Sequence, residues 1–158
     1  MTIEIKTVEN QVFVTTPYHP KFPPAARRLG GRWLAQKKVW SFDLRDEERV
    51  RELCYDIYGT DGSKTDLVDV RIVVGEDGWK AYSGGLYFAG RKIASAYGRD
   101  SGALLGEGVV LLSGSIKSGG SRKYWTSLAT AGSIFEVRDV PRRAVPETHD
   151  SLSIEIIS

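Results

Sequence analysis

The chain of 158 residues has 41% hydrophobic and 27% charged side chains, close to the average for globular domains, which argues against wholesale disorder. Its length suits one ordinary domain or two small ones, and a net charge of only +2 means that nucleic acid would have to be attracted by local clusters of cations. The single Cys54 excludes an internal disulfide framework, no run approaches the roughly 18 apolar residues of a membrane span, and the first residues contain no signal-peptide core, so we expect a cytoplasmic protein without membrane contact.

The first part of the chain alternates strand and helix patterns. Apolar side chains at alternate positions predict strands at residues 2–6 and 11–16. A proline-rich bend follows, and Pro24 suits the first turn of a short helix. Gly30 and Gly31 are expected to end that helix, because glycine adopts a positive φ at little cost.

A β-hairpin and a longer helix come next. Residues 32–34 and 38–44 predict the two arms of the hairpin. Asp46 is expected to cap a helix over residues 47–58, whose apolar side chains recur at the spacing of one helical face, and Gly59 is expected to end it.

The polar segment 60–65 is the predicted linker, which gives domains at residues 1–60 and 61–158. Short strands separated by glycine-rich turns follow, a pattern typical of a barrel or a small sandwich. The predicted strands are residues 68–74, 86–88, 92–97, 109–113, 123–128, 133–137 and 151–157. The expected fold class is therefore α+β, with a small N-terminal module of sheet and helices before a β-rich, barrel- or sandwich-like domain.

The sequence lacks the common motifs of catalytic and cofactor sites. No CxxC pair accompanies the two histidines, His19 and His149, so a structural zinc site is not expected, and His19 beside prolines suits a turn. Neither a GxGxxG after a strand nor a GxxxxGK[ST] occurs. Arg99 and Asp100 fit a turn better than a catalytic dyad, because adjacent residues of a strand point to opposite faces. We therefore expect a protein that is not an enzyme and uses no metal or cofactor.

The most informative segment, residues 21–38, carries six cations and no acidic residue. These are Lys21, Arg27, Arg28, Arg32, Lys37 and Lys38. Trp33 lies among them and Trp40 follows closely. Cations release counterions from phosphates and flat rings stack on bases, so the pattern is typical of a nucleic-acid surface. A small domain whose core tryptophans lie between solvated cations would give the same pattern.

The aromatic side chains of this segment differ in their expected burial. Period-two alternation places Trp40 and Phe42 on one face of a strand, where the neighbouring amphipathic helix favours a core position. Trp33 lies near the hairpin edge, where exposed and buried positions are both compatible with the sequence. A second set of cations occurs in the β-rich part: Arg91, Lys92, Lys117, Arg122 and Lys123, followed by Arg142 and Arg143. Lys117, Arg122 and Lys123 lie near Tyr124 and Trp125.

About a third of the chain, roughly residues 10–60, resembles a known module. Gly31-Arg32-Trp33 followed by Lys38-Val39-Trp40-Ser41-Phe42 carries the likeness, together with the preceding Phe13-Val14 and Pro17-Tyr18 and the closing Tyr58-Gly59. The pattern is similar to the HARP-type module, which occurs beside Swi/Snf-family annealing helicases and in phage and plasmid proteins. In the helicases, the resemblance implies a grip on branched or single-stranded DNA. Without motor motifs in this chain, only the grip would carry over, through Arg32, Trp33, Lys37, Lys38 and Trp40.

The functional hypothesis from the sequence is a non-catalytic protein of phage or plasmid origin that grips single-stranded or branched DNA, or RNA, through a basic surface. The alternative is a mobile-element inhibitor, similar in role to an anti-CRISPR protein, that binds a host nuclease complex. An inhibitor that mimics nucleic acid should be acidic, whereas this chain is locally basic. The sequence leaves the oligomeric state and the choice of DNA or RNA open.

Overall fold

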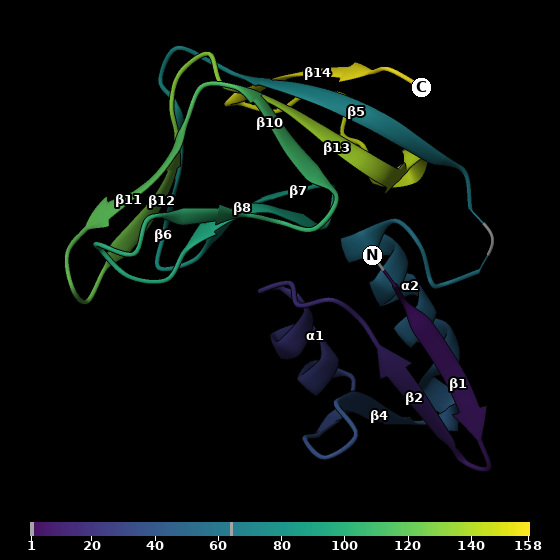
Figure 1. Cartoon of the computed structure of the whole chain (residues 1–158). Coiled ribbons are helices and arrows are strands. Elements are labelled where there is room, and N and C mark those ends of the chain that lie inside the picture. Colours follow the sequence, from purple (N-terminus) through teal and green to yellow (C-terminus); the bar gives the residue numbers. More distant parts are fainter. Residues whose placement is uncertain (1, 64) are drawn as a thin grey trace. The chain divides into compact units, whose positions relative to one another are not determined.

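The chain forms two compact units, Met1–Asp66 (unit 1) and Leu67–Ser158 (unit 2), in a computed structural model that describes residues 2–63 and 65–158 (Figure 1). About 16% of the chain is helix and 46% is strand, so the fold class is α+β. No helix among the described residues has the length and apolar character needed to cross a membrane.

Unit 1 is a four-stranded antiparallel sheet with two helices. Its strands, in the order β1-β2-β4-β3, are β1 (Glu4–Val8), β2 (Gln11–Thr15), β4 (Val39–Asp43) and β3 (Arg32–Leu34). The helices are α1 (Phe22–Arg28) and α2 (Glu47–Tyr58), and the short 3-10 turn η1 (Leu44–Asp46) leads into α2. The bounds of α2 agree with the prediction, because its apolar stripe and the left-handed Gly59 after it both act locally.

One face of this sheet is covered by the helices. Val12 and Val14 of β2 and Trp40 and Phe42 of β4 are buried on that face, together with a set of helical side chains. The helical members of this core are Phe22, Ala26, Val50, Cys54 and Tyr58. The predicted burial of Trp40 and Phe42 is therefore confirmed. Alternation leaves the other side chains of these strands on the opposite face.

The ends of the two helices depend on local chemistry. Pro23 and Pro24 lie in the first turn of α1, where a missing N–H is tolerated. The predicted capping role of Asp46 is wrong: its side chain makes no cap hydrogen bond and instead accepts one from Arg49 at 3.3 Å. Asp43 caps the preceding turn η1, because the chain inserts that turn between β4 and α2.

The boundary between the units lies later than the predicted division after residue 60. Asp61 is buried in unit 1 and accepts a hydrogen bond from Arg51 of α2 at 3.0 Å. A Cβ at Gly62 would meet the carbonyl oxygen of Ile3 at 2.3 Å, so this segment also passes close to the start of the chain. Part of the predicted linker therefore packs against unit 1, and its Lys64 lies outside the described residues.

Unit 2 contains three small antiparallel sheets, in the orders β10-β13-β5-β14, β11-β12-β6 and β7-β8-β9. The strands are β5 (Leu67–Val74), β6 (Trp79–Tyr82), β7 (Gly85–Phe88), β8 (Arg91–Ala96), β9 (Ala103–Leu105), β10 (Val109–Ser113), β11 (Ile116–Gly120), β12 (Trp125–Ala129), β13 (Ile134–Pro141) and β14 (Leu152–Ile156). A 3-10 turn, η2 (Arg142–Ala144), follows β13. The prediction of a β-rich second part is confirmed, but no sheet closes into a barrel.

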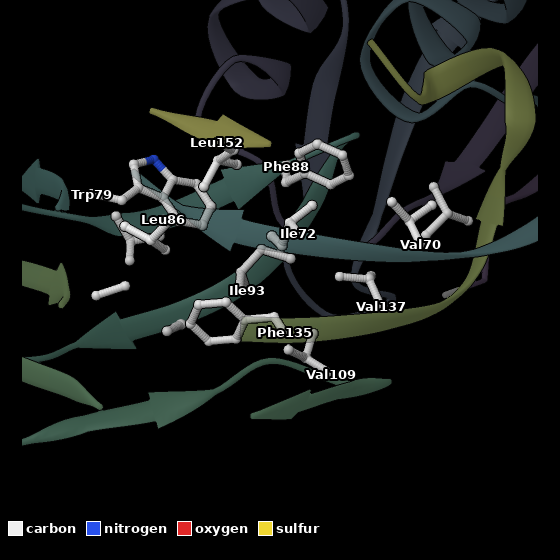
Figure 2. Close-up of a cluster of buried hydrophobic side chains, with 14 of the residues drawn as sticks. Val70, Ile72, Trp79, Leu86, Phe88, Ile93, Val109, Phe135, Val137 and Leu152 are labelled. Carbon is white, nitrogen blue, oxygen red and sulfur yellow. The ribbon is translucent and has the colours of Figure 1, made fainter. Parts of the chain in front are cut away.

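The core of unit 2 comes from alternate residues of its strands. Val70 and Ile72 of β5 lie beside Val137 of β13, while Phe88 and Ile93 extend the cluster from β7 and β8 (Figure 2). All of these side chains are buried. The sequence did not predict β6, β9 or β11, because β6 and β9 span only four and three residues and β11 ends in two glycines, so none offers a long enough apolar alternation.

Candidate nucleic-acid interface

The six predicted cations of unit 1 are all exposed. Lys21 precedes α1, Arg27 and Arg28 form its last turn, Arg32 lies on β3, and Lys37 and Lys38 lie between β3 and β4. Within the described residues, none of the six forms a salt bridge. No neighbouring carboxylate among the described residues therefore lies at ion-pair distance to neutralise their charges. Cations that are free of such partners are available to bind phosphates.

The register of the sheet shows which face Arg32 lies on. Arg32 pairs with Ser41, Ser41 with Phe13 and Phe13 with Lys6, so one row of side chains crosses the face opposite the helices. The ammonium of Lys37 lies 5.4 Å from the centre of the Phe13 ring. We call Lys6, Phe13, Arg32 and Lys37 the open face of the sheet. Lys6 and Phe13 were not predicted as site residues, because they lie far in sequence from the cation cluster.

Trp33 lies on the helix-covered side of the same strand. It pairs with Trp40 across β3 and β4, and the two rings have their centres 5.6 Å apart. The guanidinium of Arg27 lies 5.4 Å from the centre of the Trp40 ring. Trp33 is 49% exposed whereas Trp40 is buried. The buried Trp40 ring therefore supports the solvent-exposed Trp33 ring.

Beside these rings is a pocket of about 270 Å³, which we call the aromatic pocket. Its ring-bearing residues are Tyr18, His19, Phe22, Trp33, Trp40 and Tyr58, and Arg27, Thr16 and the prolines Pro17 and Pro23 complete it. Tyr18 is 67% exposed. Tyr18 and Tyr58 are among the residues that carry the resemblance but were not predicted as site residues, since α1, the hairpin and most of α2 separate them in sequence.

Internal contacts fix the walls of the aromatic pocket. The Tyr58 hydroxyl donates a hydrogen bond to the Pro17 carbonyl at 2.7 Å, which ties the end of α2 to the proline-rich bend. Phe22 meets Trp40 edge-on at 6.0 Å and His19 meets Tyr58 edge-on at 6.1 Å between ring centres. The pocket is therefore built by packed rings before any ligand arrives.

His19 supports the turn that begins α1. Its Nδ1 accepts a hydrogen bond from the Lys21 backbone N–H at 3.1 Å, which is the local turn role that the sequence predicted. Burial, and to a lesser degree the charge of Lys21, lowers the pKa of His19. The imidazole in the pocket wall is therefore neutral at physiological pH.

A single residue before Arg32 and Trp33 sets their position. A Cβ at Gly31 would lie 2.6 Å from the Phe42 ring and 2.8 Å from the Ala26 carbonyl oxygen. Only a glycine lets the chain pass this closely between the end of α1 and the core. The Gly30-Gly31 pair, which was predicted to stop α1, thus also allows β3 to lie against the pocket.

Arg28 has a different environment from Arg27, although the two are adjacent on α1. Arg28 lines a polar hollow with Arg45, Asp46, Glu48 and Arg49, where both signs of charge are present. Its field is therefore partly offset by carboxylates, unlike that of Arg27.

Arg91 of unit 2 does not belong to a binding surface. It is only 5% exposed, and its guanidinium donates hydrogen bonds to the carbonyls of Glu107 and Arg138, each at 2.7 Å. Burial lowers its pKa. The prediction that Arg91 contacts nucleic acid is corrected by this geometry, because its donors are used to join β8 to the turns before β10 and within β13.

The neighbouring Lys92 faces solvent. Its ammonium lies 3.2 Å from the Tyr97 hydroxyl and 5.7 Å from the centre of that ring. Arg122 and Lys123 lie exposed in the turn between β11 and β12, and Lys123 approaches the Tyr124 ring at 5.5 Å. Exposed tyrosine and lysine pairs thus recur in unit 2.

The sheet β11-β12-β6 brings Lys117 together with Lys80, a cation that the sequence analysis did not select. Lys117 pairs with Leu128, and Leu128 pairs with Lys80, so both lysines lie on one face. Lys80 also approaches the exposed Tyr82 ring at 5.3 Å. Predicting Lys80 from sequence would have required recognising β6, whose apolar and polar residues alternate over only four positions.

Side chains suited to metal binding are dispersed over the described residues. Among residues 2–63 and 65–158, no cluster of three or more His, Cys, Asp or Glu side chains is placed to hold a metal ion. Burial, with a smaller contribution from Asp61, raises the pKa of the Cys54 thiol to about 12, so this cysteine stays protonated.

Comparisons with family models, curated proteins and solved structures find no match to this chain. The resemblance to the HARP-type module therefore stays a prediction from the residues quoted above.

Proposed function

We propose that this protein binds single-stranded or branched nucleic acid, DNA or RNA, without catalysing a reaction on it. Unit 1 supplies the main surface, with cations for the phosphates and exposed rings for the bases. Lys117, Lys123 and Arg122 of unit 2 offer further phosphate contacts.

The observation that carries this proposal is the arrangement of Trp33. It is half exposed, rests on a buried tryptophan, and lies beside Arg27 at the edge of a pocket walled by rings. Tryptophan side chains are highly buried on average, so a ring that is 49% exposed leaves more surface in solvent than is usual for this residue. A ring held rigidly in solvent beside unneutralised cations is what stacking on an unpaired base requires.

A second candidate function is the inhibitor of a host nuclease complex, made by a phage or plasmid. Apolar side chains on two contacting strands of unit 2 favour it. Leu104 and Leu105 of β9 and Val110 and Leu112 of β10 are all exposed. Neighbouring exposed apolar side chains of this kind are a feature of protein-binding surfaces.

The test of nucleic-acid binding is a fluorescence anisotropy titration at several salt concentrations, with charge reversal of the turn between β3 and β4. The double variant Lys37→Glu/Lys38→Glu should abolish binding at moderate salt. Where residual binding is measurable, the slope of log K against log salt should fall by roughly 0.7 for each phosphate that the variant no longer neutralises. The matched control Arg45→Glu/Arg49→Glu changes the net charge by the same amount as the lysine variant. Both arginines are exposed but, unlike the lysines, are already paired with carboxylates, Arg45 with Asp43 and Arg49 with Asp46.

Unchanged affinity of the Lys37→Glu/Lys38→Glu variant, with a native circular dichroism spectrum, would contradict this surface assignment. A pull-down from host lysate with and without nuclease treatment separates the two candidate functions. Capture that survives nuclease treatment and disappears when Leu104 and Leu112 are changed to Lys supports the inhibitor.

A further inference from the structure

The aromatic pocket has walls that select for a flat, uncharged group. Tyr18 and Trp33 are exposed rings at its edge, while the buried Trp40, Phe22 and Tyr58 form its interior. At about 270 Å³ it is just below the roughly 300–1,000 Å³ of pockets that enclose drug-sized molecules. It therefore suits one small planar group rather than a folded peptide segment.

The charge of the aromatic pocket excludes cationic ligands. Aromatic cages that hold ammonium groups rely on the negative faces of rings. Here the guanidinium of Arg27 already occupies the Trp40 face at 5.4 Å, and none of the residues lining this described pocket is Asp or Glu. A second cation would meet Arg27 without a compensating carboxylate. An anionic group attached to a planar ring is the complementary ligand.

We propose that the aromatic pocket holds one unpaired nucleobase, stacked against Trp33 and Tyr18, while Arg27 contacts the phosphate next to it. This inference rests on the proposed function and specifies which part of the nucleic acid the site takes. A base in a duplex is paired and stacked on both sides, so only an unpaired or extruded base can enter. The pocket is the source of a preference for single strands, which the cations alone would not give.

The same geometry predicts little preference among the four bases. Every base has a face that stacks on an aromatic ring, so stacking tolerates sequence. One polar group of the wall is already committed internally, since the Tyr58 hydroxyl donates to the Pro17 carbonyl. Binding should therefore depend on the presence of a base more than on its identity.

The experiment uses the full chain and single-stranded oligonucleotides of about 16 nucleotides, each with 2-aminopurine at one position. Stacking on an aromatic ring quenches the fluorescence of this base analogue, and anisotropy of an end label reports total binding in the same sample. Trp33→Ala should weaken binding by about 5- to 150-fold and remove the quenching. Trp33→Tyr retains a ring and should restore most of both signals.

Matched variants separate the pocket from general effects. Leu67→Ala removes an apolar side chain of unit 2 that is 49% exposed, as Trp33 is, and should leave the quenching unchanged. Arg27→Ala should reduce affinity more than Arg28→Ala, although both remove one charge from the last turn of α1. A duplex of the same sequence should bind more weakly than the single strand, and Trp33→Ala should abolish that difference.

Three results would overturn the inference, and they are distinguishable. Salt-dependent binding of the single strand, tighter than that of the duplex but without quenching at any position, would leave the proposed function standing and remove the base pocket. Equal binding of single strand and duplex would remove both the base pocket and the preference for single strands. No binding of any oligonucleotide at low salt would remove the proposed function and the base pocket. Quenching that is abolished by Trp33→Ala and regained with Trp33→Tyr supports the pocket.

Discussion

Units 1 and 2 both contain cations beside aromatic rings, but they use them differently. In unit 1 the six clustered cations are exposed and make no ion pair within the described part of the chain, and one of them lies against a tryptophan that walls a pocket. In unit 2 Arg91 is turned inward, and Arg71 and Arg138 bind carboxylates, Arg71 with Glu136 at 2.8 Å. Spatial neighbours, rather than neighbours in sequence, therefore decide whether a cation is available to a ligand.

The greatest loss of stability is expected from substitutions in the two separate cores. Phe135→Ala in unit 2 and Phe22→Ala in unit 1 each remove a buried ring from its own hydrophobic cluster. Each should lower the free energy of unfolding by about 3–5 kcal/mol, through reduced burial and the cavity left behind. Urea denaturation, monitored through NMR resonances of each unit, should show the lower free energy of unfolding only in the unit that carries the substitution.

The matched control for these substitutions is Tyr82→Ala, an exposed ring whose removal should change stability by less than about 0.5 kcal/mol. Equal destabilisation of both sets of resonances by either phenylalanine variant would contradict the division into separate cores.

The next prediction sharpens the contrast between two adjacent cations. Arg91→Met removes the buried guanidinium that donates to the carbonyls of Glu107 and Arg138 and should lower the free energy of unfolding by about 3 kcal/mol. Lys92→Met removes only an exposed ammonium near Tyr97 and should cost less than about 0.5 kcal/mol. Chemical denaturation of the two variants measures both. A stable Arg91→Met protein with weakened nucleic-acid binding would return Arg91 to the candidate surface.

A more modest effect concerns acid stability, where unit 1 has a buried carboxylate. Burial alone would raise the pKa of Asp61, but hydrogen bonds from Ser63, Arg51 and Tyr55 outweigh it and lower the pKa to about 2. A pKa below the unfolded value of about 3.9 stabilises the folded state above pH 4, and this contribution disappears as the pH falls towards 2. It amounts to about 2 kcal/mol, so Asp61→Asn should remove that much at pH 7 and flatten the pH dependence.

Urea denaturation of the wild type and Asp61→Asn between pH 7 and pH 2 measures this contribution. Asp56→Asn, an exposed carboxylate of α2, is the control and should leave the pH dependence intact. If Asp61→Asn and the wild type lose stability in parallel below pH 4, the carboxylate does not anchor the end of unit 1.

Local signals explain which elements were predictable from sequence. The helix α2 was predicted with its observed bounds because an apolar stripe and a glycine stop both act within a few residues. The strand β11 was missed because it ends in Gly119 and Gly120, and β9 because it spans only Ala103–Leu105. These strands are held by pairing with β12 and β8, which is a long-range property that no local pattern reveals.

For the candidate site, consecutive residues were enough to predict the clustered cations, the burial of Trp40 and Phe42 and the α+β class, because charge runs and period-two alternation are local patterns. The folded arrangement was needed to show that Arg91 is internal, that Trp33 rather than Arg32 lies on the helix-covered face, and that Tyr18 and Tyr58 line one pocket. The reason is that alternation tells which side chains share a face, whereas the face that is covered depends on segments distant in the chain.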